Sequence, residues 1–172
     1  VIAEFPEARF SILGRAEESN PTGICANDIP QLESEYSVVF LPETKDVRPY
    51  LAQSSVFVLP SFYREGLPRT ILEAMATGRA VITTDMPGCR DPIIDGESGI
   101  IIPPQDAASL ATAMRSFIQN PEQAHHMGQK ARMIAENIYD VAKVNDMITS
   151  HMGLQHIPRG PTRASHIMAQ QI

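Results

Sequence analysis

Residues 56–83 read VFVLPSFYREGLPRTILEAMATGRAVIT. An apolar run from Val56 to Pro60 is followed by a loop, a helical pattern at residues 69–77 and a second apolar run at residues 80–83. Gly78 stands just after the helical pattern, where a positive φ costs glycine little. Two nearly continuous apolar runs joined by a helix are typical of a βαβ unit whose parallel strands are covered on both faces.

The same alternation continues on both sides of this unit. Further strands are expected at 10–13, 37–41 and 99–102, and Asp106, after two prolines, is expected to cap a helix that extends to residue 118. The remaining helices are expected at residues 26–35, 47–54, 122–137 and 141–152. We therefore predict an α/β fold, a Rossmann-like α/β/α sandwich in which helices flank one parallel sheet of about five or six strands.

The chain of 172 residues suits one domain, which we place at residues 1–152. Residues 153–172 mix Gly, Pro, Ser and Gln without periodicity, and we interpret them as a mobile tail or a crossover to another domain. Residues 1–6 are typical of the end of a helix or its loop, and a strand follows at once. We therefore expect an N-terminally truncated domain, cut from a longer protein.

Composition argues against several classes of function. The net charge of −6 is unfavourable for a nucleic-acid surface, and no apolar run is long enough to span a bilayer. Cys25 and Cys89 lack a metal-binding spacing, which fits a cytoplasmic protein. His125 and His126 are adjacent in a helical stretch and face different directions, a poor geometry for a metal. No metal is expected at these or at the other histidines, His151, His156 and His166.

The loop before the helix at residues 69–77 is the strongest candidate for a ligand site, because ligands of parallel sheets bind beyond the carboxyl ends of strands. Pro68 fits the first helical position, where its missing N–H would have no partner. Gly66 allows a ligand to approach the backbone closely. The free N–H groups of the first turn and the helix dipole form an anion site that suits a diphosphate.

Two carboxylates flank this anion site. Glu65 lies in the loop and Glu73 on the helix, so both can face one pocket. A carboxylate beside a diphosphate is repelled, but it accepts hydrogen bonds well from a ribose diol or from sugar hydroxyls. The alternative is structural: Glu73 is an ordinary exposed helix residue, and Glu65 an acidic residue that favours the helix dipole. The residues by themselves leave both interpretations open.

A series of motifs resembles glycosyltransferase family 4, the retaining enzymes of the GT-B fold. Glu65 and Glu73 match its Glu-x7-Glu signature, and the resemblance extends from about Phe10 to about Met152. Neighbouring stretches that match are VLPS at 58–61, LEAMATGRAVI at 72–82, TDMPGCRD at 84–91, DGESG at 95–99 and IPP at 102–104. Asn20-Pro21 and DVRPYL at 46–51 resemble the bacterial members that build O-antigen or capsule units.

The resemblance implies specific roles at the helix and its loop. Glu73 would hold the ribose hydroxyls of the donor nucleotide, and Glu65, the catalytic candidate, would lie against the donor sugar and the leaving phosphate. Backbone N–H groups of Gly66, Leu67 and Arg69 would bind the diphosphate or the sugar. The hydroxyl of Thr70 would add to the same donor site.

It also implies a place for the base and some departures from the family pattern. The base would lie near Leu41, Pro42 and Glu43, although Pro42 occupies a position usually held by glycine. The arginine and lysine that neutralise the leaving diphosphate would precede this chain, together with the N-terminal half that binds the acceptor. Arg90, on the carboxyl side of a strand, is a further candidate for contact with the ligand.

The resemblance predicts the donor-binding, C-terminal half of a GT-B glycosyltransferase, which alone is inactive. The whole protein would transfer a hexose or N-acetylhexosamine from a UDP-sugar to a growing, lipid-linked O-antigen or capsule glycan. It would need no cofactor, because the nucleotide sugar is a substrate, and it would work in the cytoplasm at the inner face of the membrane. Two alternatives are a nucleotide-sugar epimerase of the same fold and a non-catalytic protein-interaction module.

Overall fold

The computed structural model describes residues 1–16, 23–64 and 66–154. The chain divides into two compact units, Val1–Ala135 and Glu136–Ile172, which we describe separately. The five strands found in these ranges belong to the first unit: β1 (Phe10–Leu13), β2 (Val38–Leu41), β3 (Val56–Leu59), β4 (Ala80–Thr84) and β5 (Gly99–Ile102). Its helices are η1 (Ala26–Asp28), α1 (Ile29–Tyr36), α2 (Arg48–Gln53), α3 (Arg69–Ala76), α4 (Ala107–Gln119) and most of α5 (Pro121–Ile138).

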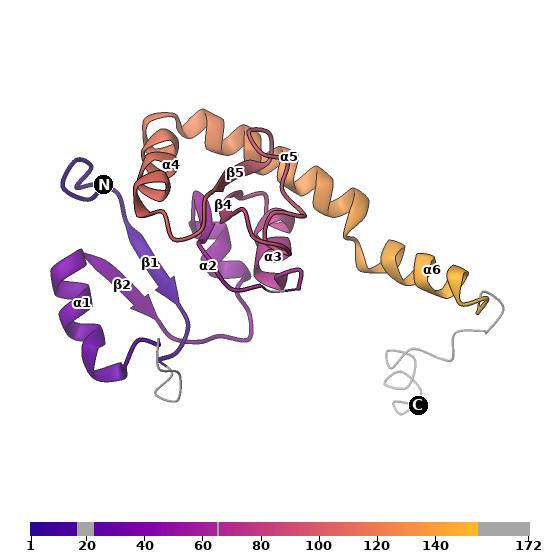
Figure 1. Cartoon of the computed structure of the whole chain (residues 1–172), viewed down its shortest axis with the longest axis horizontal. Helices are drawn as coiled ribbons and strands as arrows, with labels where there is room; N and C mark the ends of the chain where they lie inside the picture. Colours follow the sequence, from indigo (N-terminus) through magenta and orange to yellow (C-terminus); the bar gives the residue numbers. More distant parts are fainter. Residues whose placement is uncertain (17–22, 65, 155–172) are drawn as a thin grey trace, which may run out of the picture. The chain divides into compact units, whose positions relative to one another are not determined.

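Every strand pair is parallel, as the sequence predicts, but the strands form two sheets instead of one. The first sheet pairs β1 with β2, so that Phe10 lies opposite Val38. The second has the order β3-β4-β5. The expectation of one continuous sheet is therefore wrong, because β1 and β3 do not pair with each other. Figure 1 shows β1 on the side of its sheet that faces the three-stranded sheet.

Helices cover both faces of the three-stranded sheet. On one face, Ile71 and Met75 of α3 pack in a cluster with Ala131 of α5. On the other face, Phe117 of α4 packs with Met127 of α5. The central strand β4 is buried over all five residues, which agrees with its apolar sequence and with strands on both sides.

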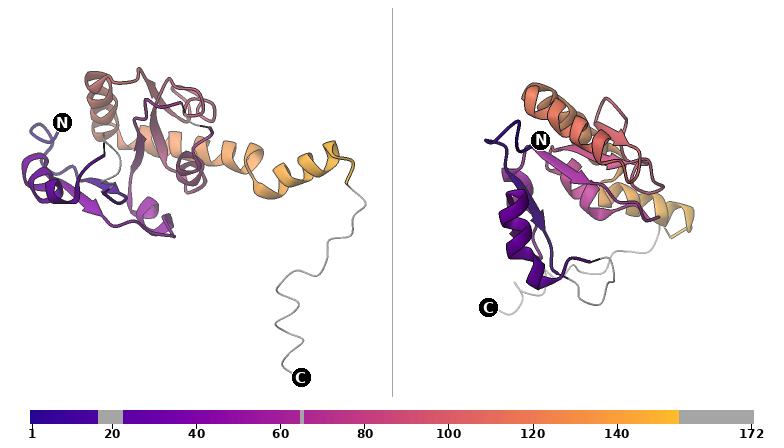
Figure 2. Two further views of the ribbon diagram at one scale, coloured as in Figure 1. Left: turned by 60° about the horizontal axis from the view of Figure 1, so that its bottom comes forward. Right: turned by 60° about the vertical axis from the view of Figure 1, so that its left-hand side comes forward.

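The two-stranded sheet is less covered. Helix α1 packs along β2 (Figures 1 and 2). Ile12 and Val39 nevertheless remain 44% and 53% exposed. Ser37, which we predicted as the first residue of β2, instead ends α1 with a φ of 50° and so cannot extend the strand.

Two sequence signals for helix ends are confirmed. Gly78 follows α3 with a φ of +71°. Asp106 caps α4, and its carboxylate accepts a hydrogen bond of 2.9 Å from the N–H of Ser109. Such a cap satisfies a backbone donor that has no partner inside the helix.

The second unit contains the last residues of α5 and helix α6 (Val141–His151). Asp140 caps α6 by accepting hydrogen bonds from the N–H groups of Ala142 and Lys143. Apart from residues 153 and 154, the predicted tail at 153–172 lies outside the described residues. No helix in the described part of the chain is long and apolar enough to cross a membrane.

Candidate functional site

The candidate site begins where β3 ends, and two threonines of β4 hold the chain there. The hydroxyl of Thr83 donates a hydrogen bond of 3.0 Å to the carbonyl oxygen of Leu59. The hydroxyl of Thr84 donates to the carbonyl oxygen of Ser61, two residues beyond the strand. Both threonine side chains are fully buried, so these bonds are shielded from competing water. The loop that leads to α3 therefore starts from a fixed point on the core.

The start of α3 has the features of an anion site. The first hydrogen bonds of the helix go from the N–H groups of Ile71 and Leu72 to the carbonyl oxygen of Pro68, at 3.2 and 3.5 Å. Pro68 is thus the N-cap residue, with an extended ψ of 121°. The sequence predicts it at the first helical position, one place further into the helix. The N–H groups of Arg69 and Thr70 precede these bonds and stand at the positive end of the helix.

The charge of Arg69 strengthens this site. A cation in the first turn opposes the helix dipole, and this turn contains no acidic residue. The Arg69 side chain is 90% exposed and so is free to meet an anion together with the first-turn N–H groups. Gly66 and Leu67, which precede the helix, are also exposed. At Gly66 a Cβ atom would have no heavy atom within 4 Å, so a ligand has room to approach the backbone.

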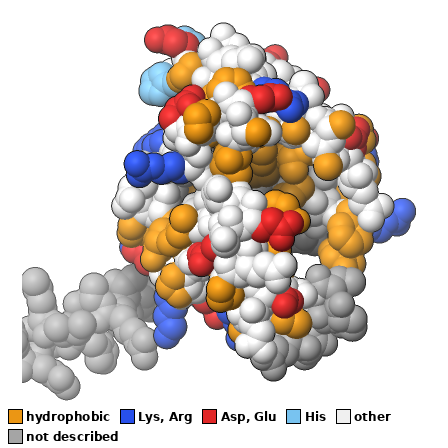
Figure 3. All heavy atoms as spheres, turned by 90° about the vertical axis from the view of Figure 1, so that its left-hand side faces the viewer, with side chains coloured by type: hydrophobic (Ala, Val, Ile, Leu, Met, Phe, Trp, Pro, Cys, Tyr) orange, Lys and Arg blue, Asp and Glu red, His pale blue; other side chains and the backbone are white. Residues whose placement is uncertain are grey.

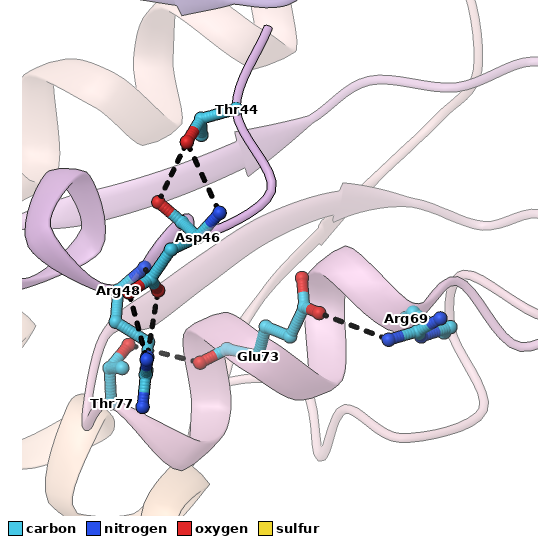
Figure 4. Close-up of polar contacts among 6 residues, drawn as sticks. All are labelled: Thr44, Asp46, Arg48, Arg69, Glu73 and Thr77. Carbon is cyan, nitrogen blue, oxygen red and sulfur yellow. Dashed lines mark hydrogen bonds and ion pairs between the residues drawn. The ribbon is translucent and has the colours of Figure 1, made fainter.

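Glu73 lies one turn further along the same face of α3. Its carboxylate oxygen Oε1 is 3.7 Å from Nη2 of Arg69, and its side chain is 37% exposed (Figure 4). An exposed pair of this kind contributes little to stability, typically about 0.3–0.5 kcal/mol. The pair is therefore easily opened by a ligand that binds either partner.

A hydrogen-bonded turn leads into α2 and is drawn with Glu73 in Figure 4. Arg48 binds both carboxylate oxygens of Asp46, at 2.7 and 2.8 Å. The hydrogen bond with the Arg48 side chain lowers the pKa of Asp46 below its ordinary value. Arg48 is thus engaged in a local clip, which agrees with a structural interpretation of the DVRPYL stretch.

The residues predicted to hold the base belong to the other sheet. Leu41 ends β2, and Pro42 and Glu43 follow it, both exposed. The Glu43 carboxylate lies 3.9 Å from the Arg15 guanidinium, beyond the carboxyl end of β1. The described structure therefore assigns the predicted base site and the Arg69–Glu73 group to two different sheets. Glu65, the predicted catalytic residue, lies outside the described residues.

Arg90, the further candidate for ligand contact, forms an ion pair. Its Nη1 atom is 2.7 Å from Oδ1 of Asp85, and its Nε atom is 3.9 Å from Oδ1 of Asp91. The hydrogen bond with Asp85 raises the pKa of Arg90. A ligand would have to compete with two carboxylates for this guanidinium, so we give it no place in the site.

Metal-binding groups are not gathered in the described ranges, where no three His, Cys, Asp or Glu side chains are placed to hold an ion. His125 forms a hydrogen bond of 3.0 Å with the side chain of Gln129. A recess beside α5 is lined by Glu97, His126 and Lys130 among others, but by none of the predicted site residues. His156 and His166 lie outside the described residues.

Sequence reasoning missed the role of Thr83 and Thr84. The available signal was a pair of hydroxyl residues that ends an otherwise apolar strand. Buried hydroxyls need hydrogen-bond partners, so such a pair indicates carbonyl groups nearby that are not paired in the sheet.

The family model for "Glycosyl transferases group 1" matches residues 1–120. The chain belongs to this family. An uncharacterised glycosyltransferase of Haemophilus influenzae is 31% identical over 142 residues, which cover 82% of this chain and 39% of that protein. A second relative is the N,N'-diacetylbacillosaminyl-diphospho-undecaprenol alpha-1,3-N-acetylgalactosaminyltransferase of Campylobacter jejuni. It is 29% identical over 136 residues, which cover 77% of this chain and 35% of that protein.

Solved structures confirm the fold of this group 1 chain. Anabaena HepE in complex with UDP superposes with a TM-score of 0.78 at 22% identity, over 86% of this chain and 41% of HepE. The fold is that of GT-B glycosyltransferases, as the sequence predicts. The chain spans about two fifths of the length of these three proteins, from 35% to 41%.

Proposed function

We propose that this group 1 chain is the donor-binding half of a retaining glycosyltransferase that uses a UDP-sugar. The observation that carries the proposal is the order of charges along α3. A cation and free N–H groups stand at the first turn, and the Glu73 carboxylate follows four residues later on the same face.

Four residues of α-helix rise about 6 Å. That length is comparable with the distance from the diphosphate of a nucleotide to its ribose diol. The helix end and Arg69 would bind the diphosphate, while the carboxylate of Glu73 would accept hydrogen bonds from both ribose hydroxyls. A purely structural role would make Glu73 the partner of Arg69, but an exposed pair of this kind offsets little of the cost of a cation at the start of the helix.

UDP is the preferred nucleotide, because HepE, which shares the fold, was solved with UDP. The transferred group would be a hexose or N-acetylhexosamine, and Glu65 would lie against it. The acceptor would be a lipid-linked O-antigen or capsule glycan at the inner face of the cytoplasmic membrane. The name of the Campylobacter relative supports the lipid-linked acceptor, since it describes transfer to a diphospho-undecaprenol.

The test is a titration of the 172-residue chain with UDP, GDP, ADP and dTDP, followed by NMR chemical shifts. We expect weak binding that favours UDP, with a Kd on the order of 1 mM, or about 4 kcal/mol. Glu73→Ala should weaken UDP binding at least about tenfold, because two hydrogen bonds to a charged group are lost.

Glu122→Ala is the matched control, since Glu122 is an exposed glutamate in the first turn of α5. It should leave UDP binding unchanged. Equal binding of UDP by Glu73→Ala and by the unmodified chain would contradict the donor site. In that case the interaction-module alternative would gain support.

A further inference from the structure

Two neighbouring aromatic side chains are exposed in the loop between β3 and α3. Phe62 is 43% exposed and Tyr63 is 53% exposed. Among the described residues, one other Phe or Tyr side chain is exposed, that of Tyr36 at the end of α1. An exposed aromatic ring forgoes the large gain in free energy that its burial would bring. Two such rings beside the candidate site therefore call for a functional explanation.

The two rings of this aromatic pair, Phe62 and Tyr63, are in contact with each other. Their centroids are 4.2 Å apart and their planes are inclined by 31°. Neighbouring side chains of an extended segment point to opposite sides, but the chain bends at Tyr63 and brings both rings to the same side. Each ring covers part of one face of the other, so the outer faces and edges of the pair remain exposed.

The aromatic pair is attached to a fixed part of the core. The buried hydroxyl of Thr84 donates a hydrogen bond to the carbonyl oxygen of Ser61, the residue directly before Phe62. The hydroxyl of Thr83 donates in the same way to Leu59, at 3.0 Å. A segment that is already held in place loses less conformational entropy when a ligand binds to it.

The exposed apolar side chains of the two-stranded sheet differ from this pair, because they are aliphatic. Ile12 of β1 and Val39 of β2 belong to this group. Seen from the side where β1, β2 and α1 lie in Figure 1, the molecule is hollowed, and hydrophobic side chains line the hollow (Figure 3). Aliphatic side chains offer apolar contact alone, whereas the face of an aromatic ring also carries a partial negative charge. The aromatic pair can therefore select a ligand by its charge distribution.

A pyranose ring has the complementary charge distribution. The C–H groups on the face of a sugar ring carry a small positive charge, and the face of an aromatic ring attracts positive charge. The hydroxyl groups at the rim of the sugar stay hydrated, so an exposed ring suits a sugar better than a lipid chain, which has to be buried. Arg64, which follows Tyr63, is also exposed, and its guanidinium can donate hydrogen bonds to sugar hydroxyls.

The aromatic pair also lies within reach of the reacting sugars. In the proposed donor site the ribose lies at Glu73 and the diphosphate at Arg69 and Gly66. Tyr63 precedes Gly66 by three residues, so their Cα atoms are at most ~11 Å apart. Transfer requires a hydroxyl of the acceptor to come within about 3–3.5 Å of the reacting carbon of the donor sugar. An acceptor ring can therefore contact the pair while its hydroxyl is in place.

We propose that Phe62 and Tyr63 form a stacking surface for a pyranose ring of the glycan acceptor. The inference rests on the proposed function, because it takes the acceptor to be a glycan. The family resemblance assigns the main acceptor contacts to the other half of the enzyme. The aromatic pair adds one contact from the donor half, on the ring whose hydroxyl attacks, and so helps to orient that hydroxyl toward the donor sugar.

The probe is methyl β-glucopyranoside, whose ring substituents are all equatorial, so that both faces of its ring present only C–H groups. Sorbitol, a polyol without a ring, is the control ligand. Saturation-transfer NMR on the 172-residue chain measures the contact. We expect transfer to the axial ring protons of the glucoside and none to sorbitol.

A matched set of variants tests the place of contact. Tyr63→Ala should reduce the transfer to the glucoside at least about threefold, because the aromatic face is lost. Tyr63→Phe keeps the ring and should keep the transfer. Tyr36→Ala removes an equally exposed ring from α1 and should leave the transfer unchanged. Equal transfer in Tyr63→Ala and the unmodified chain, or no transfer in either, would overturn the proposal.

Titrations with UDP and UDP-glucose separate this proposal from the proposed function. Tyr63→Ala should bind both ligands as the unmodified chain does, since the pair would contact the acceptor and not the donor. Weaker binding of UDP-glucose but not of UDP in Tyr63→Ala would assign the pair to the transferred sugar and overturn the acceptor contact. Transfer to the glucoside that requires Tyr63, in a chain that binds no UDP, would support the stacking surface and contradict the donor site.

Discussion

The hydroxyl of Thr84, buried at the end of β4, donates a hydrogen bond to the carbonyl oxygen of Ser61 in the loop that follows β3. The bond joins the most deeply buried strand of the molecule to the segment that leads to Gly66 and Arg69. The placement of the candidate site thus depends on a buried side chain that is not among the predicted site residues.

Thr84→Val tests this connection, because valine keeps the shape and removes the hydroxyl. We expect a loss of about 1–3 kcal/mol in the free energy of unfolding, since the buried hydrogen bond to the Ser61 carbonyl is removed. Amides of residues 61–64 should also exchange faster with solvent. Thr84→Ser keeps the hydroxyl and should restore slow exchange in the loop, although it loses a methyl group. Slow loop exchange in Thr84→Val would contradict the role of the bond.

The cap of α4 makes a prediction about pH. The hydrogen bond from the Ser109 side chain, followed by that from the Ser109 N–H, lowers the pKa of Asp106 in the folded chain. A lowered pKa stabilises the fold above the ordinary carboxyl pKa of about 3.9, and this contribution is lost as the pH falls through the lower folded value.

Thermal melts of the unmodified chain and Asp106→Ala, from neutral to acidic pH, measure this effect. The difference in melting temperature should stay constant down to about pH 5 and shrink below about pH 4. In Asp106→Asn, an uncharged side chain caps the helix, so its melting temperature relative to Asp106→Ala should not change over this pH range. A difference that grows on acidification would show that the sign is wrong.

The positions of the strands and helices follow from the sequence, but their pairing does not. Apolar runs locate the five strands of the described residues, although only those of the three-stranded sheet are covered on both faces. The same runs say nothing about which edges meet, so a single sheet was expected where the structure has two. Likewise, the sequence predicts the start of α3 to within one residue. It does not predict that Leu41 belongs to the two-stranded sheet while the helix of Glu73 packs on the three-stranded sheet.

Close backbone contacts are also invisible in the sequence. A Cβ atom at Gly128 would collide with the carbonyl group of Gly78, so α5 approaches the end of α3 through a glycine. Gly99 of β5 meets the Val81 carbonyl in the same way. Glycine in the middle of a helix lowers helix stability, so the sequence alone gives no reason for Gly128 in α5. The reason is its contact with Gly78, which only the folded structure shows.

Gly66→Ala separates ligand approach from stability. A methyl group at Gly66 has open space and the residue does not have a positive φ, so the free energy of unfolding should change by less than about 0.5 kcal/mol. If a diphosphate lies against this backbone, the methyl group should weaken UDP binding several-fold. NMR titration and urea unfolding of the same sample measure both effects. Unchanged UDP affinity would place the diphosphate elsewhere.

Arg69→Ala should change binding without changing stability. Removing a cation from the first turn of α3 relieves a clash with the helix dipole of about 0.3–1 kcal/mol, while losing the exposed pair with Glu73 costs about 0.3–0.5 kcal/mol. The free energy of unfolding should therefore stay within about 0.5 kcal/mol.

The binding of UDP should fall by about ten- to a hundredfold in the same variant, because a charge-assisted hydrogen bond to phosphate is worth about 1.5–3 kcal/mol. Its dependence on salt should also weaken, since one fewer cation meets the ligand. UMP, which lacks the second phosphate, should lose less affinity than UDP if Arg69 binds the diphosphate. Arg132→Ala removes an arginine of α5 and is the control for net charge. Equal losses for UMP and UDP would show that Arg69 contacts the part that the two ligands share, the nucleoside or its first phosphate, and would contradict a contact with the second phosphate.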